Sequence, residues 1–146
     1  MTIDIGVNIG NLPVTKKILD KINKIQSETQ EVFQEFAQGV GERMIDRTPV
    51  DTGRAKGNWQ TKLNETPTES LLRYDKEGVE AKEELREVTS KATVDDKITI
   101  SNCVTYTENL EYGSSKQAPE GMVRITVAEA DEIFQSAVNK VKAKNR

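Results

Sequence analysis

The chain has 146 residues, which is typical of one domain, and it carries 31% charged and only 35% hydrophobic residues with a formal net charge of −3. So small an apolar fraction indicates either a partly disordered chain or one whose neighbouring subunits complete the burial of its core. The net acidity, with no stripe of Lys and Arg, argues against nucleic-acid binding as the main task, and the basic residues from Lys140 to Arg146 are typical of a helix C-terminus.

The single cysteine, Cys103, excludes an internal disulfide and fits a protein made in a reducing cytoplasm. No signal-peptide pattern is visible at the N-terminus. No apolar run approaches the roughly 20 residues needed to cross a bilayer. We therefore expect a soluble protein that has no membrane partner.

The first predicted element is a half-buried strand, because apolar residues alternate from Ile3 to Ile9. Gly10, Asn11 and Pro13 then end the alternation.

A long helix is predicted over residues 14–47, where apolar residues recur at spacings of three and four. At 1.5 Å per residue such a helix would reach roughly 50 Å, which is longer than most single domains need. Gly39 and Gly41 weaken its C-terminal part and indicate a bend or the close approach of another backbone. Thr48 ends it, because a residue before proline is pushed toward extended geometry.

The middle of the chain predicts a turn at residues 49–53, then a short strand at residues 59–63 whose side chains alternate. Residues 64–96 are harder to interpret. They hold a polar loop and a helix-favouring stretch with sparse apolar positions, interrupted by Gly78. This is typical of a surface helix or of a partly mobile helical insertion rather than of core.

A second strand with period two is predicted from Ile98 to Tyr106, with Asn102 on its apolar face and Cys103 on the other. A loop over residues 113–121 follows it.

The last predicted element is an amphipathic helix from about Val127, with Thr126 and Glu129 as a capping box. Its predicted apolar face comprises Val127, Ala130, Phe134, Ala137 and Val141.

The order of these elements predicts an α+β fold, in which a long N-terminal helix and a C-terminal helix pack on a small, mostly antiparallel sheet. We expect residues 1–146 to form a single domain, with residues 64–96 as its insertion.

Catalytic chemistry finds little support in the residue types. The chain has no histidine, which removes the commonest general base and the commonest metal ligand. Cys103 therefore has no histidine to activate it, and the acidic pairs Asp95-Asp96 and Glu83-Glu84 have the polar surroundings of solvated surface charges. We expect no enzyme activity, no catalytic residue, no cofactor and no metal.

Two segments carry a more specific signal. The first is Arg47-Thr48-Pro49-Val50-Asp51-Thr52-Gly53-Arg54, and the second, residues 100–124, reads ISNCVTYTENLEYGSSKQAPEGMVR. Together they resemble the tail-completion and head–tail joining (neck) proteins of long-tailed bacteriophages, over about residues 14–63 and 97–142. Ala55 departs from the family pattern, in which leucine is common after the turn.

The resemblance implies a structural or interface role for the residues that match the family motifs. These are Pro49, Val50, Asp51, Thr52, Gly53, Arg54, Asn102, Tyr106, Glu111, Gly113, Ser115, Gln117, Ala118, Pro119 and Gly121.

The residue types in these motifs suggest local roles. Asp51 and Thr52 can bond to nearby backbone, and Gly53 can adopt a positive φ. Asn102 needs hydrogen-bond partners if it is buried, and nearby loop backbone is a source of them. Glu111 either pairs with Arg54 across the fold or both charges are exposed.

The resemblance further implies a ring-forming virion protein of the neck, which completes the tail and joins it to the DNA-filled head without catalysis. The implied partners are other copies of the chain in a ring, a hexamer when assembled, together with tail-terminator or tail-tube proteins and head connector or stopper proteins. DNA would only pass through the central channel. The protein would lie in the virion, and in the host cytoplasm during assembly.

Two other functions remain open from the sequence. One is a tail-terminator ring, which stops polymerisation of the tail tube. The other, from a different class, is a cellular adaptor whose long helix docks in a partner groove.

Overall fold

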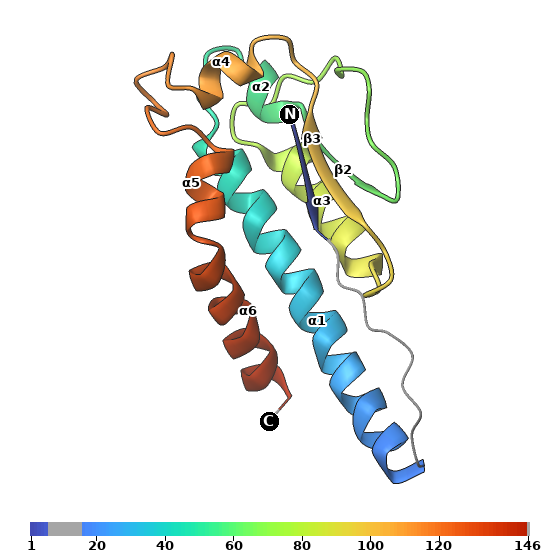
Figure 1. The fold of residues 1–146 in the computed structure, drawn as a ribbon. Helices are drawn as coiled ribbons and strands as arrows, with labels where there is room; N and C mark the ends of the chain where they lie inside the picture. The colour runs from blue at the N-terminus through green and yellow to red at the C-terminus, as the bar shows by residue number, and fades with distance from the viewer. Residues whose placement is uncertain (6–15, 146) are drawn as a thin grey trace.

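The computed structural model describes residues 1–5 and 16–145, and it has the predicted α+β fold (Figure 1). The elements are β1 (Thr2–Ile5), α1 (Lys16–Arg47), α2 (Arg54–Gly57), β2 (Trp59–Leu63), α3 (Val79–Lys91), β3 (Ile98–Asn102), α4 (Thr107–Glu111), α5 (Val123–Ala128) and α6 (Ala130–Lys144). Most of the predicted first strand, residues 6–9, and the residues expected to end it lie outside the described part of the chain. Among the described residues, no helix combines the length and the apolar character needed to cross a membrane.

The sheet has the strand order β1-β3-β2, and both pairings are antiparallel. All residues of the central strand β3 are buried. It ends at Asn102 rather than at Tyr106, so the predicted strand is too long. The cause is the Asn102 side chain, whose Oδ1 accepts a hydrogen bond from Val104 N at 3.1 Å and turns the chain toward α4.

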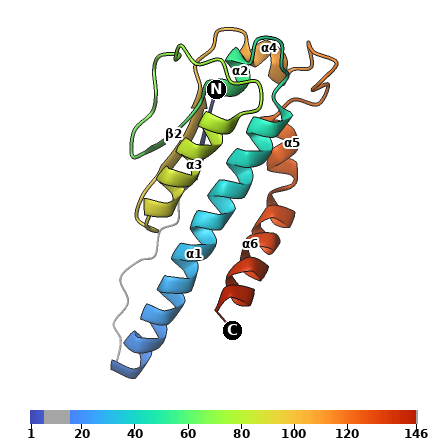
Figure 2. The same ribbon diagram turned by 180° about the vertical axis from the view of Figure 1, so that it is seen from behind.

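Helix α1 is the central helix of the molecule and lies between α3 and α6 (Figure 2). Its residues Phe33, Ala37, Val40, Met44 and Ile45 enter the core, together with Trp59, Leu85 and Ile100. The N-terminal part of α1 extends past the end of α6 (Figure 1). The 32-residue helix spans about 48 Å, as its sequence predicted.

Gly39 and Gly41 allow two helices to approach α1 closely. A Cβ at Gly39 would lie 2.8 Å from Ile133 Cγ2 of α6. A Cβ at Gly41 would lie 2.6 Å from Leu85 Cδ1 of α3. The two glycines thus make room for side chains of two different helices, and not for another backbone as expected.

Residues 64–96 include the expected helix, α3, which is mostly exposed, but its inner face belongs to the core, contrary to expectation. Helix α3 buries Ala81, Leu85 and Thr89 against α1 and β2. The buried positions repeat every four residues, but two of them are small, so a search for large apolar side chains finds little there. The preceding loop is bound to β2, where Arg73 Nη2 donates to Trp59 O at 2.9 Å.

The predicted capping box is also wrong. Thr126 lies inside α5 and its hydroxyl donates to Met122 O at 2.6 Å, while α6 begins only at Ala130. Glu129 instead accepts hydrogen bonds from Arg47, at 2.7 Å, and from Arg43, which tie α1 to the α5–α6 junction. A carboxylate next to two guanidinium groups takes those partners in preference to a single backbone N–H.

The break before α6 also changes its buried face. Ile133, Ala137 and Val141 are buried, as predicted for the last two. Val127 and Phe134 are 53% and 50% exposed, so their predicted burial is wrong. Phe134 keeps one edge-to-face contact with Phe36, at a centroid distance of 6.0 Å.

Candidate functional site

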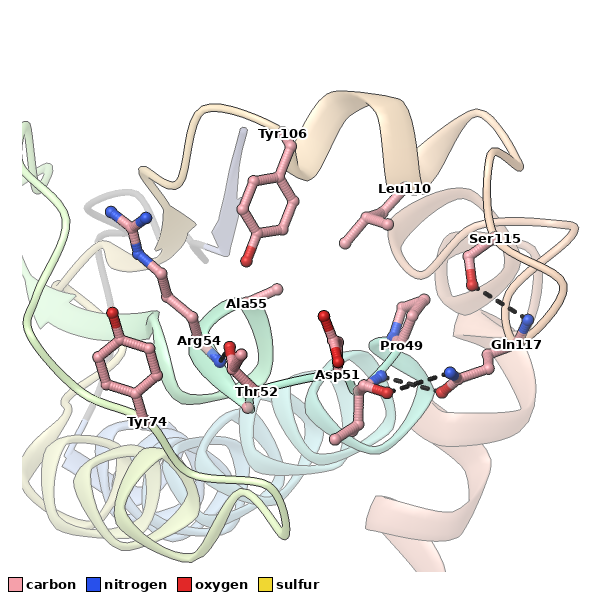
Figure 3. Close-up of a pocket in the computed structure, with 12 residues that line it drawn as sticks. Pro49, Asp51, Thr52, Arg54, Ala55, Tyr74, Tyr106, Leu110, Ser115 and Gln117 are labelled. Carbon is pink, nitrogen blue, oxygen red and sulfur yellow. Dashed lines mark hydrogen bonds between the residues drawn. The ribbon is translucent and has the colours of Figure 1, made fainter.

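The two motif segments, about 50 residues apart in the chain, meet at one end of the molecule and line a pocket of about 410 Å³ (Figure 3). Its lining residues are Pro49, Val50, Asp51, Thr52, Gly53, Arg54, Ala55, Tyr74, Tyr106, Leu110, Ser115 and Gln117. Most of the residues marked by the resemblance therefore share one surface. The remaining motif residues hold the walls of the pocket in position.

A reciprocal pair of hydrogen bonds joins the two segments. Val50 N donates to Gln117 Oε1 at 2.9 Å, and Gln117 Nε2 donates to Val50 O at 3.1 Å. Ser115 Oγ in turn accepts from Gln117 N at 3.2 Å (Figure 3). The glutamine thus pairs with both backbone groups of one residue of the turn, much as a neighbouring strand would, and this fixes the distance between the two walls.

The turn at residues 49–53 has the conformation that its sequence indicated at Thr52 and Gly53. Thr52 Oγ1 accepts from Arg54 N at 3.3 Å, and Gly53 has φ +87°. A Cβ at Gly53 would lie 2.5 Å from Lys76 N, so glycine is required for space as well as for φ. The expectation for Asp51 is wrong. Its exposed carboxylate makes no hydrogen bond to the described backbone and faces the pocket instead (Figure 3).

Asn102 connects α2, which follows the turn, to the second segment. Its side chain is buried, with Nδ2 donating to Ala55 O at 2.8 Å and Oδ1 accepting from Thr107 Oγ1 at 3.0 Å. The predicted need for partners is confirmed, and loop and helix-end groups satisfy it. One amide thereby positions β3, α2 and α4 together.

Glu111 does not pair with Arg54, so that expectation is wrong. It is 2% exposed and binds the start of α5, accepting from the backbone N–H of Met122 (2.7 Å), Val123 (2.8 Å) and Arg124 (2.8 Å). The Arg124 guanidinium adds a further bond to the carboxylate at 3.1 Å. Arg124 is the partner because it lies at the start of α5, where backbone N–H donors also face the carboxylate.

These contacts set the charge state of Glu111. Burial raises its pKa, but the N–H donors of Arg124, Met122 and Val123 together outweigh burial and hold the pKa below its ordinary value. Glu111 is therefore a buried anion that holds the 113–121 loop closed.

The glycines and small residues of the loop close it further. Gly113 and Gly121 have φ +86° and +83°, and a Cβ there would lie 2.7 Å from Pro119 O and 2.3 Å from Glu111 O. Ala118 is buried, whereas Pro119 is exposed. The glycine pattern of the motif thus reflects a loop folded tightly on Glu111.

Arg54 has a different status from the other motif residues. Its Nε is inaccessible to solvent and unpaired, and its guanidinium makes no ion pair or hydrogen bond to any residue that the structure describes. Buried donors are nearly always paired in folded proteins, so an orphan of this kind is unusual.

Tyrosines gather around this end of the molecule. The chain has three tyrosines, and all are exposed here: Tyr74 by 60%, Tyr106 by 37% and Tyr112 by 71%. Tyr112 lies beneath Arg124, whose Cζ is 4.9 Å from the ring centroid. Sequence reasoning missed Tyr74, because it lies in the segment that carries no resemblance. The signal was an aromatic residue in an otherwise polar stretch.

The groups considered for chemistry lie away from this pocket. Cys103 follows β3 rather than lying within it, half-buried, with Sγ 3.4 Å from Pro67 O. Glu84 is not a solvated charge as expected, since it accepts from Thr61 N at 2.7 Å. Among the described residues, no group of His, Cys, Asp and Glu is arranged to hold a metal ion.

Comparisons of the chain with protein-family models, with curated proteins and with solved structures found no match.

Proposed function

We propose that this chain is a structural protein of the neck of a long-tailed bacteriophage, which completes the tail and joins it to the DNA-filled head. It acts by assembly with copies of itself in a ring, a hexamer when docked, and with the adjoining tail and head proteins. DNA passes through the ring without being recognised, and no reaction is catalysed.

One observation carries the proposal. The two segments that resemble neck proteins converge on one pocket and are joined there by the Val50–Gln117 hydrogen bonds. Buried Asn102 and Glu111 hold both segments in place from behind. A motif that builds one exposed, rigid surface from distant parts of the chain is what a contact site in an assembly would need.

Apolar surface left exposed elsewhere supports a ring. Ile25, Val127 and Phe134 are each at least half exposed, and they lie on α1, α5 and α6. Neighbouring subunits bury surface of this kind when a ring closes. The same surface would also suit a tail terminator, so the two roles must be separated genetically.

The test is electron microscopy of tails made by a phage that lacks this gene, before and after purified protein is added. We expect tails of normal length that join heads only after the addition. Tails of abnormal length would assign the terminator role instead. Intact infectious particles without the gene would exclude both phage roles and leave the cellular adaptor.

A further inference from the structure

The free guanidinium of Arg54 is the most unusual feature of the pocket. It lies at one edge of the pocket, next to Tyr74 and Tyr106 (Figure 3). Its Nε is sealed from water without a partner, so a ligand can reach only the two terminal NH₂ groups of the guanidinium. A planar guanidinium with free donors is suited to a carboxylate, which can accept two parallel hydrogen bonds.

The charges of the pocket restrict what can bind beside Arg54. Among its lining residues, Asp51 and Arg54 are the charged ones, and they form no ion pair with each other. Asp51 lies toward Pro49, away from the Arg54 guanidinium (Figure 3). The pocket therefore presents a positive end and a negative end, with Ala55 and Tyr106 between them (Figure 3).

We propose that this pocket binds an acidic side chain of a partner protein in the assembled neck. The Asp or Glu carboxylate pairs with Arg54, and an adjoining apolar side chain packs against Tyr106 and Leu110. The assignment rests on the proposed function, because it takes this surface as an assembly contact. Arginine and tyrosine are also the residue types that most often dominate binding energy at protein interfaces.

A nucleic-acid phosphate fits this pocket less well than a carboxylate does. Phosphate backbones are bound by several Lys or Arg side chains in a row, because the charge density of the polymer is high. Here a single arginine shares the pocket with Asp51, which repels a polyanion. A ligand with one carboxylate and a neighbouring hydrogen-bond donor fits both ends of the pocket, because the carboxylate pairs with Arg54 and the donor with Asp51.

The test uses the folded full-length chain and the Nε–H signal of Arg54 in a ¹⁵N NMR spectrum. The probe is the peptide acetyl-Leu-Asp-Leu-amide, with acetyl-Leu-Asn-Leu-amide as its neutral control. We expect a saturable shift of the Arg54 signal with the Asp peptide and at least a ten-fold weaker response to the Asn peptide. Equal responses to the two peptides, or none at Arg54, would overturn the proposal. A larger Arg54 shift with a short single-stranded oligonucleotide would assign the pocket to nucleic acid and overturn it as well.

Variants connect this binding to Arg54. R54Q should abolish the response of the Tyr106 signals to the Asp peptide, and K116Q, which removes an exposed charge from the nearby loop, should leave it unchanged. R54K keeps the charge without the planar fork and should bind several-fold more weakly, which provides the test if R54Q does not fold. Unchanged binding by a folded R54Q or R54K protein would refute the role of Arg54.

Adding the same variants to tails separates this proposal from the proposed function. If the wild-type protein joins tails to heads and R54Q does not, both stand. If R54Q joins them as well as wild type does, the acidic contact is wrong and the neck function stands. If the wild-type protein itself fails, the neck function is wrong, and the peptide titration still decides whether the pocket binds a carboxylate.

Discussion

At the scale of single residues, buried polar side chains with several partners hold this end of the molecule together. Asn102 and Glu111 are each at most 2% exposed, and each makes a hydrogen bond to the backbone of another segment. Such groups make a loop rigid because leaving any of their partners unpaired in the interior is costly. The shape of the pocket therefore depends on side chains that do not line it.

Glu111 provides the first prediction. E111Q replaces an acceptor-only carboxylate with an amide whose NH₂ must face backbone N–H donors, so we expect the free energy of unfolding to fall by about 2 kcal/mol. Urea denaturation measures the change. E108Q on the same helix α4 is the control, because Glu108 is exposed and its side chain makes no hydrogen bond or ion pair with the described residues. Equal effects of the two substitutions would contradict the role given to Glu111.

The pH dependence of stability should report the same carboxylate. The pKa of Glu111 in the folded protein lies below its ordinary value of 4.5, so its stabilising contribution is fully present above about that pH. The contribution is lost as the pH falls through the folded pKa. The difference in urea midpoint between wild type and E111Q should therefore shrink as the pH is lowered from 7 toward 3. A difference that stays constant over this range would show that Glu111 is not a buried anion.

At the scale of elements, α1 organises the fold because two of its faces accept a helix at close range. Gly39 faces α6 and Gly41 faces α3, and a side chain at either would meet a buried neighbour within 3 Å. Glycine lowers the stability of a helix by about 1 kcal/mol relative to alanine, and the close packing of the neighbouring helices offsets that loss here.

The packing role of Gly41 can be tested with a double-mutant cycle. G41A places a methyl group 2.6 Å from Leu85 Cδ1 in a fully buried site, and we expect a net loss of about 1 kcal/mol, since overpacking outweighs the gain in helix propensity. In an L85A background the methyl group has room, so G41A should become neutral or stabilising. Thermal unfolding of the four proteins gives the coupling. Additive effects would mean that α3 does not approach α1 at Gly41.

At the scale of the whole molecule, the proposed contact surface and the main core lie in different places. The pocket is at one end, built by α2, α4 and their loops, while most of the core lies between α1, α3 and the sheet (Figure 1). Exposed contacts at the pocket can therefore change with little effect on overall stability. This separation lets assembly and folding be measured independently.

The Val50–Gln117 bridge provides the prediction at this scale. Q117E keeps an acceptor for Val50 N but places a carboxylate oxygen against Val50 O, so the two walls should separate. Because the site is exposed, we expect a loss of stability of less than about 1 kcal/mol. We expect several-fold fewer tails joined to heads when the variant is added to tails that lack the protein. Q135E, an exposed change on α6, is the matched control, and equal joining by both variants would contradict a contact role for the bridge.

The sequence alone determined those features that depend on local periodicity and backbone chemistry. The long helix ending before Pro49, the short strand at residues 59–63 and the positive φ of Gly53 follow from the alternation of side chains and the limits that proline and glycine place on φ. The predicted partners of Asn102 follow from the cost of burying an unpaired amide. These signals extend over a few residues and need no knowledge of what lies opposite.

Only the tertiary structure decided which side chains meet. Thr126 and Glu129 have the spacing of a capping box, but two arginines of α1 lie beside Glu129 and bind it more strongly than a helix end would. Ala81 and Thr89 become core because α1 covers them, and Glu111 binds the start of α5 instead of Arg54 because the loop returns there. Such choices depend on the energies of competing long-range partners, which a linear pattern does not contain.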